Sequence, residues 1–210
     1  MARNQSFLIA AAIGIVAIAS GMLLARSLME MGSGAEPAVV KATVLTPARP
    51  LPEISLIDQA GAQFDGSRLK NRWSLLFFGF TRCPDVCPAT LGTLAQVAKS
   101  LADLPPGERP QIVLVSVDPQ RDTPEALASY VRFFDPSFTG LTGTQLAIDS
   151  LTRALGVPVA ISKTGNGDYT VDHSAAIFLI DPQGAMRALF STPHEPAVIA
   201  ADYRRIVAAG

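Results

Sequence analysis

The stretch "SLLFFGFTRCPDVCP" (Ser74–Pro88) joins an apolar run to a loop that contains the only two cysteines of the 210-residue chain. The apolar run, Ser74–Phe80, predicts a short strand that is buried on both faces. Pro84 presets its own φ angle and fits the first turn of a helix. We therefore expect Cys83 at the start of a helix and Cys87 one turn later on the same face.

Strand and helix patterns alternate along the rest of the chain from Leu51. A hairpin that turns at Ala60-Gly61 precedes Ser74, and a second apolar run, Gln111–Val117, predicts another buried strand. Helical patterns occupy four segments, Thr90–Leu104, Thr123–Phe134, Gln145–Leu155 and Pro196–Ala208. Shorter strands are expected at residues 139–141, 158–163, 168–181 and 185–190. This alternation predicts an α/β domain over residues 49–210, with a central sheet that helices cover on both faces.

The amino-terminal part of the chain contains an uncharged apolar run, Phe7–Leu24. Because this run is long enough to span most of a bilayer as a helix, we expect a cytoplasmic stub (1–6), a transmembrane anchor (7–25) and a tether (26–48). A cleaved signal peptide is the alternative, since Ala17–Ala19 resembles a cleavage site. The apolar run continues past that point, which favours the anchor.

Charge gives little support to partners other than proteins and the membrane. The formal net charge is −1, and the few basic residues are scattered, so we expect no nucleic-acid partner. Arg3 and the free amine favour a cytoplasmic amino end, but Arg26 at the other edge of the apolar run nearly balances them. The charges therefore favour a globular part outside the cytoplasm by a small margin.

Three interpretations fit the cysteine pair: a structural disulfide, a redox-active pair and half of a metal site. A disulfide across so short a loop removes little entropy from the unfolded chain, and a domain of this size has no need of it. The free N–H groups and the positive dipole at a helix start are expected to stabilise a thiolate, an effect that Asp85 partly offsets. The residues therefore indicate a reactive or metal-binding dithiol.

The chain has only two histidines that could add a metal ligand, His173 and His194. A structural zinc site needs four ligands, whereas two thiolates and one imidazole make a three-ligand set whose soft sulfurs favour Cu(I). His173 stands where a polar segment enters a buried strand and could lie over the cysteine loop, although a lone histidine there is more often structural. His194, in "STPHEP", is expected to be an exposed loop residue.

Three ordered blocks of the sequence resemble the Sco/SenC family of copper proteins: "FGFTRCPDVCP", "VSVDPQRDTP", and "VDHSAAIFLID" followed by "PQG". The resemblance covers the chain from about Leu51 to its end and extends to the single amino-terminal membrane segment. It implies a thioredoxin-like fold and copper bound by Cys83, Cys87 and His173. We expect "DPQRDTP" itself to form a strand-to-helix turn rather than to take part in the chemistry.

The resemblance also implies a function, which is to help assemble the dinuclear copper centre of cytochrome c oxidase. The family does so by delivering copper, by reducing the target cysteines, or by both. The implied partners are the copper-accepting subunit of the oxidase, an upstream copper donor and a thioredoxin-like reductant. Because the chain lacks an Arg- and Ser-rich presequence, we expect a single-pass protein of the bacterial inner membrane with its globular domain in the periplasm.

Four functions are open at this point. A copper chaperone would hold Cu(I) on the two thiolates and His173. A thiol–disulfide reductase would use Cys83 as nucleophile and Cys87 as resolving thiol, without metal. A peroxidase would use the same cysteines. Of these three functions, only the chaperone gives His173 an obligatory role. A copper-sensing or redox-signalling module would use the same residues and differ only in its partner.

Overall fold

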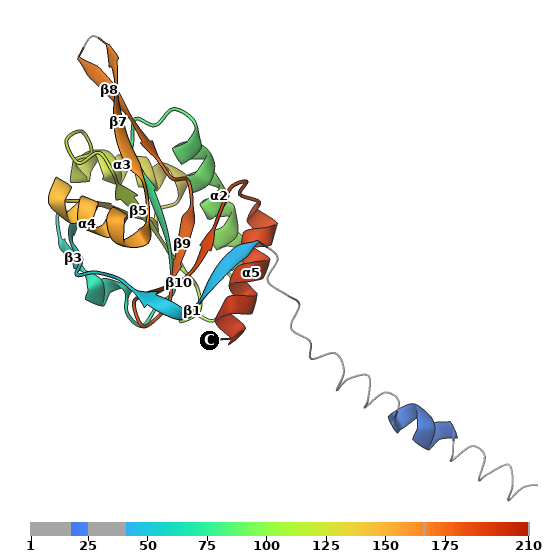
Figure 1. The fold of residues 1–210 in the computed structure, drawn as a ribbon. Helices are drawn as coiled ribbons and strands as arrows, with labels where there is room; N and C mark the ends of the chain where they lie inside the picture. The colour runs from blue at the N-terminus through green and yellow to red at the C-terminus, as the bar shows by residue number, and fades with distance from the viewer. Residues whose placement is uncertain (1–17, 25–40, 166, 210) are drawn as a thin grey trace, which may run out of the picture. The chain divides into compact units, whose positions relative to one another are not determined.

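Residues 18–24, 41–165 and 167–209 are described by the computed structural model of the chain (Figure 1). The chain divides into two units, Met1–Ala38 and Val39–Gly210. In the first unit residues 18–24 are helical, while the predicted stub, most of the predicted anchor and most of the tether lie outside the described residues. Within the described residues, no helix is both long and apolar enough to cross a bilayer.

The described part of the second unit contains ten strands: β1 (Ala42–Pro50), β2 (Ser55–Asp58), β3 (Gln63–Asp65), β4 (Ser74–Gly79), β5 (Gln111–Ser116), β6 (Thr139–Thr142), β7 (Val159–Gly165), β8 (Asp168–His173), β9 (Ile177–Ile180) and β10 (Ala185–Phe190). Eight of them form one mixed sheet in the order β1-β10-β9-β4-β5-β6-β2-β3. The central strands β4, β5 and β6 run parallel, and the other neighbours are antiparallel. β7 and β8 form a separate antiparallel hairpin (Figure 1).

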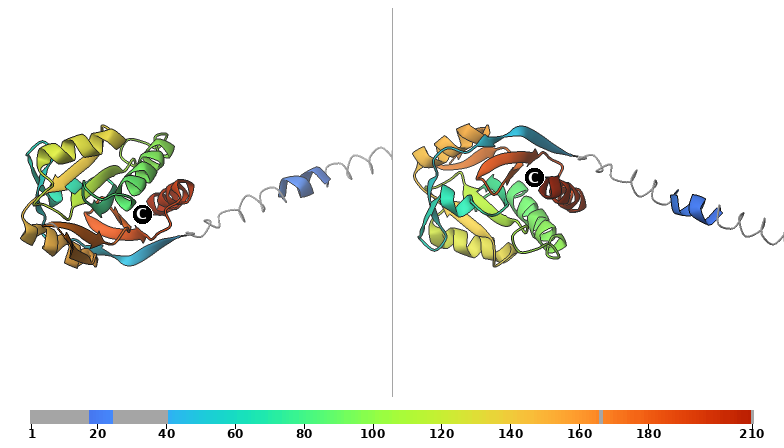
Figure 2. Two further views of the ribbon diagram at one scale, coloured as in Figure 1. Left: turned by 90° about the horizontal axis from the view of Figure 1, so that it is seen from above. Right: turned by 90° about the horizontal axis from the view of Figure 1, so that it is seen from below.

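Helices cover the sheet in the described part of this unit: α2 (Val86–Ser100), α3 (Pro124–Phe134), α4 (Gln145–Leu155), α5 (Pro196–Ala209) and a short 3-10 helix, η1 (Gly66–Leu69). α2 and α3 lie on one face of the sheet with α5 packed beside α2, and α4 lies on the other face (Figures 1 and 2). Thr123 and Thr144 cap the starts of α3 and α4, and Gly156 ends α4 in the left-handed conformation at φ +71°. The predicted α/β class is confirmed.

The centre of the sheet is its most buried part. All six residues of β4 and all four residues of β9 are buried, as expected for strands that are covered on both faces. β4 pairs with β5 on one side and with β9 on the other. The cysteine loop follows β4 directly, so it starts from a strand that neighbouring strands hold on both sides.

Two segments differ from the sequence prediction. Residues 42–48, assigned to the tether, form most of the edge strand β1. The sequence pattern does not indicate this strand because none of its residues is fully buried. The single strand expected at residues 168–181 is in fact two strands. β8 ends at His173 in the hairpin, and β9 begins at Ile177 in the main sheet. His173 therefore lies where the chain passes from the hairpin to the sheet.

Candidate metal centre

The cysteine loop connects β4 to α2, and the Cys83 sulfur takes part in starting the helix. The backbone N–H of Cys87 donates a hydrogen bond to Cys83 Sγ at 3.3 Å, which satisfies one of the free N–H groups of the helix start. The first helical hydrogen bond runs from Ala89 to the carbonyl oxygen of Asp85. α2 consequently begins at Val86 with Asp85 as its N-cap, so Cys83 lies two residues before the N-cap.

The two thiols are both free, but they differ in exposure. Cys83 is 8% exposed, whereas Cys87 is 0% exposed. Burial raises the pKa of the Cys87 thiol far above its ordinary value, and the hydrogen bond with Cys83 adds to the increase. Cys87 is therefore a neutral thiol at neutral pH in the metal-free protein. A helix start favours a thiolate, but at Cys87 desolvation outweighs the helix dipole.

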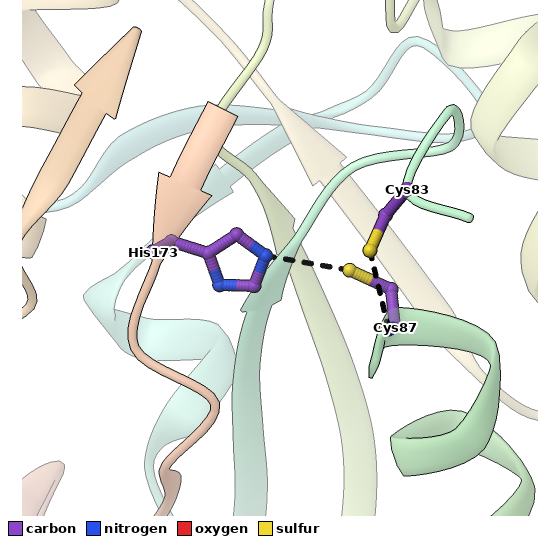
Figure 3. Close-up of side chains that lie close together, drawn as sticks. All are labelled: Cys83, Cys87 and His173. Carbon is purple, nitrogen blue, oxygen red and sulfur yellow. Dashed lines mark hydrogen bonds between the residues drawn. The ribbon is translucent and has the colours of Figure 1, made fainter. Parts of the chain in front are cut away.

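His173, the last residue of β8, lies beside the two sulfurs (Figure 3). Its Nε2 atom is 3.4 Å from Cys87 Sγ, and its Nδ1 atom is 3.0 Å from the carbonyl oxygen of Ser174. A carbonyl oxygen only accepts hydrogen bonds, so Nδ1 carries the proton and Nε2 presents its lone pair to Cys87. The neutral Cys87 thiol donates to that lone pair.

The surroundings of His173 keep the imidazole neutral. The rings of Phe77 and Phe80 pack against it edge to face, with centroids 6.0 and 5.9 Å away. Burial lowers the pKa of His173, and the hydrogen bond to Ser174 and the charge of Asp172 oppose this only in part. A neutral imidazole with its second nitrogen held by a carbonyl oxygen is the form in which histidine binds metals.

These three residues form a set that fits a metal ion. One ligand atom from each of Cys83, Cys87 and His173 lies within 4.8 Å of the other two. Two sulfurs and one imidazole nitrogen are the soft donors that Cu(I) prefers. A structural zinc site needs a fourth ligand, and no other His, Cys, Asp or Glu among the described residues joins the group.

A pocket of about 300 Å³ opens onto the site. Cys83 and His173 border the pocket, whereas Cys87 does not. The residues that line it are Phe80, Cys83, Pro84, Asp85, Val86, Thr170, Val171, Asp172 and His173. A metal ion or the thiol of another protein therefore reaches the site from the side of Cys83 and His173.

His194 is not an exposed loop residue, as the sequence analysis expected, and it does not join the ligand group. Its side chain is half-buried, and its Nε2 atom lies 2.7 Å from the carbonyl oxygen of Ala175. Ala175 belongs to the short connection between His173 and β9. His194 thus holds the backbone just after the candidate ligand, a contact between two loops that no sequence pattern indicates.

The turn "DPQRDTP" has the expected strand-to-helix geometry. It also holds the cysteine loop in place, a role that the sequence does not indicate. Asp122 is fully buried. It accepts hydrogen bonds from the N–H and the hydroxyl of Thr81 at 3.1 and 2.6 Å and from the hydroxyl of Ser116 at 2.7 Å. Thr81 lies two residues before Cys83, so the carboxylate fixes the start of the cysteine loop.

Comparison with known proteins finds relatives that are named as copper-binding or SCO proteins. A protein of Stutzerimonas stutzeri, whose name describes it as copper-binding, is 40% identical over 147 residues, which are 69% of this chain and 71% of that protein. The mitochondrial SCO2 homolog of Bos taurus is 39% identical over 159 residues, and the match spans 75% of this chain but only 59% of that relative.

The solved structures agree with this relationship. The crystal structure of Arabidopsis thaliana ScoI with copper bound superposes with a TM-score of 0.72 at 31% identity, covering 76% of this chain and 99% of that one. This agreement supports the thioredoxin-like form of the α/β fold. The sequence profile of SCO1/SenC matches residues 46–208, which is most of the chain. The chain therefore belongs to the SCO1/SenC family.

Proposed function

We propose that this protein is a membrane-anchored copper chaperone that holds Cu(I) on Cys83, Cys87 and His173 and helps to assemble the dinuclear copper centre of cytochrome c oxidase. The observation that supports this function is the convergence of the three ligand atoms within 4.8 Å, with a donor set that suits Cu(I). The similar Arabidopsis protein contains bound copper in its crystal structure.

Loading with Cu(I) requires little rearrangement of the site. Metal binding needs deprotonated sulfurs, so the thiol protons of Cys83 and Cys87 are released to solvent as the ion enters. The hydrogen bond between Cys87 and His173 is then replaced by one bond from each residue to the ion. The copper stays Cu(I) throughout, and no electrons are consumed. With three protein ligands the ion can accept a further ligand from the pocket, so an acceptor thiolate can replace the protein's ligands one at a time.

The proposed location is the bacterial inner membrane, with residues 7–25 as the anchor and the domain in the periplasm. There the protein would meet the copper-accepting oxidase subunit, a copper donor and a thioredoxin-like reductant. A periplasm-specific reporter fused after Gly210 should be active, and the protein should resist carbonate extraction. An active cytoplasmic reporter at Gly210 would reverse the orientation, and an amino terminus processed near Ser20 would restore the signal-peptide interpretation.

A thiol–disulfide reductase is the second candidate, and the arrangement of the two sulfurs favours it. Cys83 borders the pocket, and Cys87 lies behind it. In this reaction the Cys83 thiolate attacks a disulfide of the target and forms a mixed disulfide. Cys87 then displaces the target thiol, so that the target gains two electrons and the protein is left with a Cys83–Cys87 disulfide. His173 has no necessary part in this exchange.

The experiment that separates the two functions compares His173→Ala with Cys83→Ala in cells. If copper handling is the task, both variants should lose cytochrome oxidase assembly to the same extent while accumulating at the level of the wild type. If oxidase activity stays near wild type in His173→Ala but fails in Cys83→Ala, the protein acts as a reductase. The purified His173→Ala protein should bind Cu(I) at least about 10–100-fold more weakly, yet still form and release its disulfide.

A further inference from the structure

We propose that Arg121 and Tyr169 are positioning residues for His173. They attach the β7–β8 hairpin to the loop Asp118–Asp122, and the same loop holds the cysteine loop through Asp122. The three elements together set the separation between the imidazole and the two sulfurs. This inference rests on the proposed function, because it assigns a role at the same metal site.

The hairpin needs such an attachment because the main sheet does not hold it. Among the described residues, β7 and β8 pair only with each other, in a two-stranded sheet of their own. A two-stranded hairpin has little stability by itself, so contacts with the rest of the domain must fix its position. His173 is the last residue of β8, and the position of the hairpin therefore decides where the imidazole lies.

Arg121 and Tyr169 supply the polar part of these contacts. The Tyr169 hydroxyl donates a hydrogen bond to Asp118 Oδ1 at 2.6 Å. Arg121 Nη1 donates to the carbonyl oxygen of Tyr169 and to Asp168 Oδ1, both at 3.0 Å. The guanidinium also lies over the Tyr169 ring, 3.8 Å from its centroid, while Arg121 Nε pairs with Asp118. These residues, Asp118, Arg121, Asp168 and Tyr169, are called the Arg121 cluster below.

The burial of the Arg121 cluster makes it stronger than a typical surface ion pair. The side chains of Arg121 and Asp118 are only 12% and 2% exposed, so solvent screens their interaction little. By contrast, Asp168 is 64% exposed and adds less. The main polar attachment is therefore between Tyr169 and Arg121 on one side and Asp118 on the other, and it adds to the burial of Val171 of β8 in the core.

The other end of the loop Asp118–Asp122 is attached to the cysteine loop. The Asp122 carboxylate accepts hydrogen bonds from the N–H and the hydroxyl of Thr81, at the start of the cysteine loop. The hydroxyl of Ser116 donates a hydrogen bond to the Asp122 carboxylate and accepts one from the backbone N–H of Asp118, which links that carboxylate to the Asp118 backbone. One short loop thus contacts both the hairpin with His173 and the loop with Cys83.

His173 lies between attachments on both sides of its own segment. On one side Val171, two residues away, is buried in the core, and Tyr169, four residues away and therefore about 13 Å along an extended strand, makes the polar attachment. On the other side is Ile177, where β9 enters the main sheet. If the Tyr169 attachment is lost, the segment keeps the apolar contact of Val171 but loses its polar attachment, so β8 can turn about Val171 and shift Nε2 away from the sulfurs. The cysteine pair, held by Asp122, should not be affected.

Tyr169→Phe in the full-length protein tests this role, since it removes only the hydroxyl and keeps the ring under Arg121. Cu(I) affinity, measured by competition with a chelator, should fall about 10–100-fold, the range for losing a residue that orients a ligand. Tyr203→Phe is the matched control, because its hydroxyl is also hydrogen-bonded, to the Glu108 carbonyl oxygen at 2.6 Å in another part of the domain. The control should keep wild-type affinity.

A double-mutant cycle shows whether Tyr169 acts through His173. In a His173→Ala background, Tyr169→Phe should cause no further loss of Cu(I) affinity. An equal loss in both backgrounds, or a loss as large in Tyr203→Phe, would overturn the proposal. Arg121→Lys provides a second variant with the charge retained, and its affinity should lie between those of wild type and Tyr169→Phe.

A metal-free measurement keeps this inference separate from the proposed function. NMR of the imidazole in the reduced wild type should show one ordered ring with the proton on Nδ1. Tyr169→Phe should increase the ring's mobility, while Tyr203→Phe should not. If wild type binds no copper but the ring responds in this way, the chaperone function fails and the positioning role stands. An unchanged ring in Tyr169→Phe overturns the positioning role whatever the protein binds.

Discussion

The Nε2 atom of His173 lies 3.4 Å from the sulfur of Cys87, although 86 residues separate them in the sequence. The proton on Nδ1 is held by the carbonyl oxygen of Ser174, so the atom that faces the sulfur is the one with the free lone pair. In the metal-free protein this lone pair accepts the Cys87 S–H. The same two atoms are positioned to bind one metal ion once that proton leaves.

We first predict that the reduced full-length protein binds one Cu(I) with sulfur and nitrogen in the first coordination shell. The prediction follows from the donor set of Cys83, Cys87 and His173. X-ray absorption should detect both scatterers, and Cys83→Ser should lose one sulfur while keeping the nitrogen. A shell made only of nitrogen and oxygen would contradict this assignment.

The second prediction concerns the different reactivity of the two thiols. Cys87 is completely buried and protonated, whereas Cys83 borders the pocket. Since the thiolate is the reactive form and needs access, brief treatment of the reduced metal-free protein with iodoacetamide at neutral pH should modify Cys83 first. Peptide mass spectrometry would measure the order, with fully unfolded protein as the control in which both react alike. Faster modification of Cys87 in the folded protein would show that the pair has been assigned in the wrong order.

Much of the fold could be predicted from the sequence because local signals are strong there. Gln145–Leu155 is a helix with the predicted bounds, since Thr144 caps its start and Gly156 ends it. The buried run of β4 is likewise apparent as an unbroken apolar segment. β1 was missed because it has no buried residue and hence no alternating pattern. Its pairing with β10 is a tertiary contact.

The candidate site was less accessible to sequence reasoning. The spacing of Cys83 and Cys87 indicates a dithiol. His173 lies beside them because β8 ends at this residue and the chain then passes to β9 in the main sheet, which no local pattern indicates. The raised pKa of Cys87 could not be inferred from the helix start, because it comes from burial by the whole domain. Asp122 reads as a turn residue, and its contact with Thr81 appears only in the folded chain.

The third prediction is a pH dependence of stability that comes from His173. Because its pKa is lowered in the folded protein, the unfolded chain takes up this proton at a higher pH than the folded chain does. The part of the unfolding free energy linked to His173 is therefore fully present above about pH 6.5 and is lost as the pH falls below that value. Urea unfolding of the reduced metal-free protein should show this loss, and His173→Gln should lack it. Parallel pH curves for the two proteins would exclude a lowered pKa.

The last prediction is that copper binding and oxidation of the cysteines exclude one another. A disulfide uses the same sulfur electrons and valences that the two thiolates offer to Cu(I), so Cys83 and Cys87 cannot do both at once. In an oxidising compartment the pair must be reduced before loading, which requires a thioredoxin-like reductant as partner. The disulfide form, mixed with Cu(I) under argon without reductant, should leave most of the metal free, because His173 alone is a weak site. After reduction with a dithiol and removal of the reagent, the same sample should bind one equivalent. Tight stoichiometric binding by the disulfide form would refute the assignment of both sulfurs as ligands and leave His173 to be explained by another site.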